Sequence, residues 1–169
     1  MKKIANFFLF SSLLVTMVSS CKKEDKPENK PEEKVTAYAD IKREHIAAKD
    51  ATLSSDEFEA SNADGLVMKP SDVLIYKTSS GLYGKMEIVA IDKENNYKLK
   101  FNAVTYKADG SILKEGKDLY VRGTYGFDLE ILEEVIEEDG SKDFSWDKAS
   151  DVVVNFVPSG KAKFAKYTF

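Results

Sequence analysis

The stretch "YKLKFNAVTYK", residues 97–107, decides the fold class of this chain. In an extended strand successive side chains point to opposite faces, so the stretch divides into two sets. The first set is the more apolar one and is expected to face a core: Tyr97, Leu99, Phe101, Ala103 and Thr105. The second set is mostly polar and is expected to face away from it: Lys98, Lys100, Asn102, Val104 and Tyr106. This period of two predicts a β-strand.

The segments around this strand continue the pattern. "ADGS" at 108–111 predicts a hairpin turn, because Asp109 and Gly110 tolerate a positive φ. Upstream, "DVLIYKTSS" and "GLYGKMEIVAIDKENN" predict two strands, the second with Met86, Ile88 and Ala90 facing inward. Downstream, "DLYVRGTY" and "SDVVVNFVPSGKAKFAKYTF" predict more strands, broken at Gly123 and at 158–160. Residues 36–169 are therefore predicted to form a single, mainly β domain, an antiparallel sandwich or barrel-like fold.

Two segments fit this rhythm less well. "DLEILEEVIEED" places Leu129, Leu132 and Ile136 at helical spacing, so residues 129–138 are expected to form either a short amphipathic helix or a ragged hairpin, ended by Gly140. Residues 38–61 are also ambiguous: Ile41, His45 and Ala48 would share a helix face, but the stretch from Ile46 to Leu53 also fits a strand. We predict strands there. The Ser, Asp and Asn residues at 54–64 are typical of turns.

Residues 1–20 have the pattern of a secretory signal peptide. Lys2 and Lys3 precede an apolar run from Ile4 to Val18, which is shorter than the ~20 residues of a membrane-spanning helix. The only cysteine of the chain, Cys21, follows at once, after Val18, Ser19 and Ser20. This order resembles the lipobox of bacterial lipoproteins. The resemblance implies cleavage before Cys21 and acylation of its thiol; the alternative is a free cysteine after an ordinary signal.

Residues 21–35 are predicted to be a disordered tether, because "CKKEDKPENKPEEK" offers nothing apolar to bury. Lys23, Glu24 and Asp25 resemble the export signal that sends some Bacteroidetes-type lipoproteins to the outer face of the outer membrane. The resemblance implies a lipid anchor in the outer membrane with the domain on the cell surface. A periplasmic orientation, with these charges serving only as a solvated linker, is the alternative.

A second resemblance covers residues 72–169. The blocks "SSGLYGK", "VTY" with "DGS", "LYVRGTYGFDLE", "DFSW" and "VPSGKAKFAKY" are similar to a module of Bacteroidetes-type secreted lipoproteins of uncertain function. The resemblance implies a β fold and an envelope location, and it brings no activity with it. The sequence departs from the module at Tyr125, where a tryptophan would be expected after "RGT".

Charge and cysteine content exclude several classes of partner. The formal net charge is −4, and cleavage before Cys21 would make it −6 by removing Lys2 and Lys3. An acidic chain is a poor partner for nucleic acid or for anionic head groups. A single cysteine excludes intramolecular disulfides, so stability must come from a packed core.

The sequence contains no catalytic constellation. The only histidine, His45, has no partner fixed by sequence, and one histidine without a free thiolate makes zinc improbable. "SSGLYGK" lacks the spacing of a phosphate loop. The acids at 130–139 do not follow the spacing of a calcium loop and are interpreted as a solvated face; a glycosidase pair among them is a third possibility that sequence cannot resolve. We therefore predict no metal, no cofactor and no enzymatic activity.

Aromatic residues beside glycines are the remaining signal. Tyr83, Tyr125 and Trp146 lie near glycine-rich turns and could stack on a sugar, although packing in the core is the more common role of such residues. We therefore expect a non-enzymatic module that binds a glycan or a protein at the cell envelope. The alternative is a structural or accessory subunit of an envelope assembly.

Overall fold

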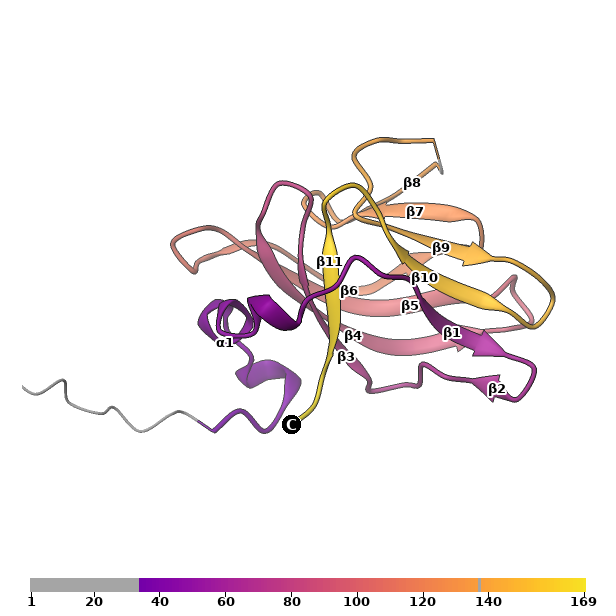
Figure 1. Ribbon diagram of the computed structural model, residues 1–169, viewed down its shortest axis with the longest axis horizontal. Coiled ribbons are helices and arrows are strands. Elements are labelled where there is room, and N and C mark those ends of the chain that lie inside the picture. The colour runs from indigo at the N-terminus through magenta and orange to yellow at the C-terminus, as the bar shows by residue number, and fades with distance from the viewer. Residues whose placement is uncertain (1–33, 137) are drawn as a thin grey trace, which may run out of the picture. The chain divides into compact units, whose positions relative to one another are not determined.

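The computed structural model describes residues 34–136 and 138–169 (Figure 1). The predicted signal peptide, Cys21, the export residues Lys23, Glu24 and Asp25, and the predicted tether as far as residue 33 lie outside the described residues, as does Glu137. One short α-helix and two 3-10 turns precede the strands: η1 (Tyr38–Asp40), α1 (Arg43–Ala47) and η2 (Asp50–Thr52). The strands are β1 (Phe58–Asn62), β2 (Gly65–Leu66), β3 (Val73–Lys77), β4 (Tyr83–Asp92), β5 (Lys98–Tyr106), β6 (Ile112–Val121), β7 (Tyr125–Asp128), β8 (Glu133–Val135), β9 (Phe144–Lys148), β10 (Val154–Pro158) and β11 (Lys163–Tyr167).

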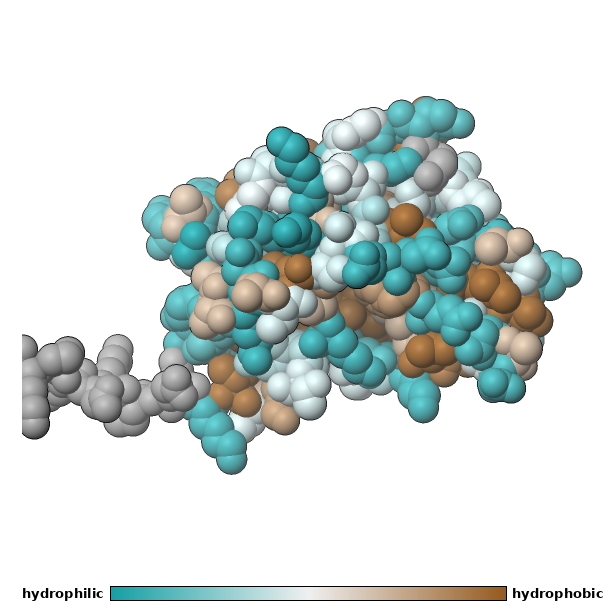
Figure 2. Space-filling view, viewed as in Figure 1, coloured by the Kyte–Doolittle hydropathy of each residue, from teal (hydrophilic) through white to brown (hydrophobic). Residues whose placement is uncertain are grey.

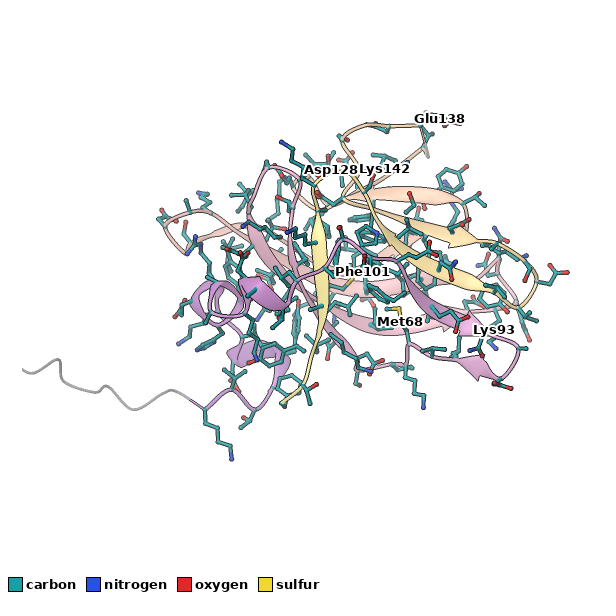
Figure 3. All side chains as sticks on the ribbon, viewed as in Figure 1. Met68, Lys93, Phe101, Asp128, Glu138 and Lys142 are labelled. Carbon is teal, nitrogen blue, oxygen red and sulfur yellow. The ribbon has the colours of Figure 1, made fainter. Side chains whose placement is uncertain are left out.

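The strands form two antiparallel sheets, as the period-two pattern predicted. Sheet A has the order β11-β3-β4-β5-β6 and sheet B the order β2-β1-β10-β9-β7-β8. The main core lies between them, where Leu74, Met86 and Phe101 of sheet A pack with Phe144 and Phe156 of sheet B. Phe101, labelled in Figure 3, lies in this layer. The rings of Phe127 and Phe144 are edge-on to the Phe101 ring, with centroid-to-centroid distances of 4.9 and 6.1 Å. The fold is an unclosed β-sandwich.

Strand β5 confirms the alternation for the inward-facing set of the deciding stretch, but Val104 and Tyr106, predicted to face away from a core, are also buried, because they pack in a second cluster on the outer face of sheet A. Its five predicted core residues, Tyr97, Leu99, Phe101, Ala103 and Thr105, are all buried. The turn after β5 is also where it was predicted: the amide of Lys107 donates to Ser111 O at 2.7 Å, and Gly110 has a φ of 87°. Strand β4 differs in one detail. A bulge between Ile88 and Ala90 shifts the alternation, so Ile91 is buried instead of the predicted Ala90.

The prediction of strands for residues 38–61 is correct only for 58–61, which belong to β1, and it is wrong for 38–53. The segment folds into η1, α1 and η2, and it covers the outer face of sheet A. Ile41, Ile46 and Leu53 pack there against Val73 and Ile75 in a second core cluster. The helix face predicted as the alternative is also incorrect, because Ala48 is exposed; the segment bends between its three short turns and buries residues that do not share one helical stripe.

The described residues of the stretch 129–138 form the hairpin alternative, not the helix. The chain turns tightly between β7 and β8, and Phe127 pairs with Glu134 across the two strands. Leu129 is buried, whereas Ile131 and Ile136 are 46% and 61% exposed, so the apolar residues of the stretch do not share a buried face. Asp128 stabilises the turn by accepting hydrogen bonds from the amides of Glu130 and Ile131 at 2.8 and 3.3 Å.

Candidate functional site

The three aromatic residues predicted to bind a ligand do not form one surface. Trp146 is buried in the main core, and its indole N–H donates to Tyr97 O at 2.6 Å, so it has no ring face open to a sugar. Tyr125 pairs with Trp146 across β7 and β9 and is half-buried, with the Arg122 guanidinium 4.2 Å from its ring centroid. Core packing is therefore the role of Trp146, and the stacking interpretation is wrong for this residue.

Tyr83 lies elsewhere, on the outer side of sheet A. Its hydroxyl donates to Asp50 Oδ1 at 3.0 Å, and the cations of Arg43 and Lys77 are each 5.2 Å from its ring centroid. Lys77 also donates to the same Asp50 oxygen at 3.0 Å. These contacts tie the helical segment to β3 and β4, so Tyr83 has a structural role here.

The other residues that the sequence raised for chemistry also have local structural roles. His45 Nδ1 accepts a hydrogen bond from the amide of Lys42 at 3.1 Å at the start of α1. In the acidic stretch, Glu130 accepts a hydrogen bond from Ser80, and Glu134 pairs with Arg122, whose Nε donates to its Oε1 at 2.8 Å. Within residues 34–136 and 138–169, no group of three or more His, Cys, Asp or Glu residues is placed to hold a metal ion.

A pocket on the outer face of sheet A, called the polar pocket below because charged side chains lie in its mainly apolar lining, is the best candidate site. It has a volume of about 460 Å³ and lies beside η1, over β4, β5 and β6. Its lining includes apolar groups of Val104, Ile112 and Gly116. Charged side chains come from two strands, namely Lys85 and Glu87 from β4 and Glu115 and Lys117 from β6.

Lys85 is the unusual residue of this polar pocket, because its side chain is only 4% exposed. Its ammonium donates to Tyr38 O at 2.7 Å and to Ala39 O at 3.3 Å, and it lies 4.5 Å from the Tyr38 ring centroid. Burial lowers the pKa of Lys85, and the nearby carboxylates of Glu115, Asp40 and Glu87 oppose that shift. An ammonium has three N–H donors, so one remains for a further partner.

The acceptors in the polar pocket come from β4, beside Lys85, and from β6, on the far side of β5. Glu87 Oε2 accepts a hydrogen bond from Asn102 Nδ2 at 3.1 Å, and this contact fixes one carboxylate against β5. Glu115 is exposed at the rim. Tyr106 is satisfied already, because its hydroxyl donates to Ile41 O at 2.9 Å, and burial raises its pKa to about 12.

Chemically, this arrangement suits binding better than catalysis. It offers two cationic donors, Lys85 and Lys117, and two carboxylate acceptors above an apolar floor, and among its lining residues no nucleophile is held beside a base. Sequence reasoning missed Lys85 because alternation places it on the outer face of β4, where a lysine is normally solvated. The only signal was its position between Gly84 and Met86, in a stretch from Tyr83 to Ile91 whose only other charged residue is Glu87.

Comparison with known proteins adds no relative. The chain matches no protein-family model, no curated protein and no solved structure. In the part of the chain that the structure describes, no helix has the length and apolar character needed to cross a membrane.

Proposed function

We propose that this chain is a lipid-anchored outer-membrane protein whose β domain is a non-enzymatic binding module for a glycan. The anchor is supported by the sequence order that places Cys21 after an apolar run and small residues. The binding role is supported by one observation, the buried ammonium of Lys85 with a donor to spare, flanked by Glu87 and Glu115.

A glycan fits the polar pocket for a chemical reason. Sugar hydroxyls both donate and accept hydrogen bonds, so they can pair with the ammonium of Lys85 and with the two carboxylates at once. The C–H groups of a sugar ring would contact the apolar side chains of Val104 and Ile112. Hydrogen bonds to charged groups contribute about 1.5–3 kcal/mol each, so a few of them are enough for measurable binding.

The test of the binding role is a glycan-array screen with the full chain, followed by calorimetry with the best-bound glycan. We expect Glu115→Gln and Lys85→Met each to weaken binding at least tenfold. Lys100→Met is the matched control, because Lys100 is exposed on β5 and does not line the polar pocket. An empty array, or binding that survives both substitutions unchanged, would show that the polar pocket is not a glycan site.

The anchor needs a separate test. Intact mass spectrometry of the natural chain and of Cys21→Ala should show an acylated residue 21 only in the natural chain. Protease treatment of whole cells should then remove the domain if it faces the outside. A protected domain would place the module in the periplasm, and an unmodified Cys21 would refute the anchor.

A further inference from the structure

An apolar cleft opens at one side of the sandwich, away from the polar pocket. It has a volume of about 430 Å³ and lies where β1 and the segment after β2 approach β3 and β11. Its floor is made by buried side chains of Met68, Leu74 and Phe164, and its walls include Phe58 and Val67. Figure 2 shows brown and tan atoms in a hollow between teal side chains near the middle of this face, and Met68 is labelled at this position in Figure 3.

The cleft runs along an edge of sheet A that is only partly paired. β11 is the edge strand, and Ser54 forms an isolated bridge with Phe164 on its free side, with N···O distances of 3.0 and 2.8 Å. In an antiparallel ladder the backbone groups of alternate residues point to the same side, so the N–H and C=O of Lys166 also point to the free side. Across residues 34–136 and 138–169, no backbone group is paired with Lys166 there.

The rim of the cleft is acidic. Asp56, Glu57 and Glu59 are exposed around it. Lys166 is the only cation of the lining, and its ammonium is 2.9 Å from Asp72 Oδ2. Among the described residues, none of the three exposed carboxylates forms an ion pair. The rim therefore carries unbalanced negative charge that favours a basic partner.

We propose that this cleft binds an extended, basic peptide segment of a partner protein. The segment adds to the free edge of β11 through the backbone N–H and C=O of Lys166. Its alternate side chains enter the apolar cleft, and its basic side chains meet the rim. Strand addition to an exposed sheet edge, with pockets for alternate side chains, is a known mode of peptide recognition. Such binding would make this domain a subunit of an assembly, which is the alternative function that the sequence raised.

A second copy of this chain fits the cleft less well. Pairing two β11 edges about a twofold axis would place the same surface on both sides of the interface. The acidic rim of Asp56, Glu57 and Glu59 would then face its own copy, and like charges repel. The charge of the rim therefore selects a partner of different composition.

The test is binding of a labelled, capped peptide of seven residues that alternates lysine and valine, measured by fluorescence anisotropy with the full chain in detergent. We expect saturable binding that is at least tenfold tighter than that of a glutamate–valine peptide. N-methylation of the central residue, which removes one backbone donor but keeps the side chains, should weaken binding at least fivefold.

Protein variants separate the cleft from general charge attraction. Glu57→Lys should weaken binding at least tenfold, while Glu94→Lys, the same change at an exposed turn residue outside the cleft, should leave it within twofold. Lys166→Pro, which removes the outward N–H, should also weaken it. Equal loss in Glu57→Lys and Glu94→Lys, or no effect of N-methylation, would overturn the proposal. Concentration-dependent dimerisation that Lys166→Pro abolishes would overturn it in favour of a second copy.

Discussion

Asp143 offers the most direct test of the energetics of this fold. Its side chain is 1% exposed, and it accepts hydrogen bonds from the amides of Ser79 and Leu129 at 2.8 and 3.0 Å. It therefore joins the loop after β3 to the end of β7. Burial raises the pKa of Asp143 from 3.8 to about 6, the two amide hydrogen bonds oppose the shift, and the nearby carboxylates of Asp128 and Glu130 add to it.

The raised pKa fixes the sign of the pH dependence. Between pH 3.8 and about 6, the folded protein keeps a proton on Asp143 that the unfolded chain has lost. The contribution of this group to the free energy of unfolding is therefore complete below pH 3.8 and decreases as the pH rises to about 6. At about 1.4 kcal/mol per pH unit, the decrease amounts to about 3 kcal/mol.

The assay compares the natural chain with Asp143→Asn, which cannot titrate. Urea unfolding followed by the fluorescence of Trp146 gives the free energy of unfolding of each protein from pH 3.5 to 7.5. We expect the natural chain to lose about 3 kcal/mol relative to Asp143→Asn over this range. Asp147→Asn removes an exposed carboxylate of β9 and is the control for net charge. A difference between the natural chain and Asp143→Asn that stays constant within about 0.5 kcal/mol would refute the reasoning.

Three substitutions test the packing, each by denaturant unfolding with circular dichroism. Gly84→Ala should destabilise by about 1–3 kcal/mol, because a Cβ at this position would overlap the buried ring of Tyr76; unchanged stability would mean that the ring can move aside. Trp146→Phe should lower the free energy of unfolding by about 2–4 kcal/mol, because it leaves a void and an unpaired carbonyl at Tyr97. A decrease below about 1 kcal/mol would show that the hydrogen bond from Trp146 to Tyr97 O does not stabilise the fold. Thr124→Gly should stabilise by about 0.5–1 kcal/mol, because Thr124 has a φ of 70° in an exposed turn; a loss of stability would show that its side chain contributes more than the strain costs.

The sandwich could be predicted because its strands carry local information. One face of β5 is buried in the main core along its whole length, so apolar residues recur at every second position of its sequence. The turn at 108–111 was predictable for a similar reason, since Gly110 supplies the positive φ that the turn uses. The bulge in β4 was not predictable, because Ile88, Val89, Ala90 and Ile91 are all apolar and the sequence does not show where the alternation shifts.

The helical segment could not be predicted because its structure depends on a partner surface. Ile41, Ile46 and Leu53 are too far apart to mark one helix face or one strand face. They are buried because Val73 and Ile75 present apolar side chains on the outer face of sheet A. If only one face of β3 lay on a core, Val73 and Ile75 on its other face would be exposed to solvent. The unbroken apolar run of β3 was therefore the available signal that both faces of sheet A are covered.

The same packing creates the candidate site. The carbonyls that hold the ammonium of Lys85 belong to Tyr38 and Ala39, and this segment is held on sheet A because Tyr38 and Ile41 pack in the second core cluster. Without η1, Lys85 would be an ordinary lysine on a solvated sheet face. The burial of its ammonium, and with it the polar pocket, is therefore a tertiary property. A pattern within one strand could predict which face Lys85 points to, but not what covers that face.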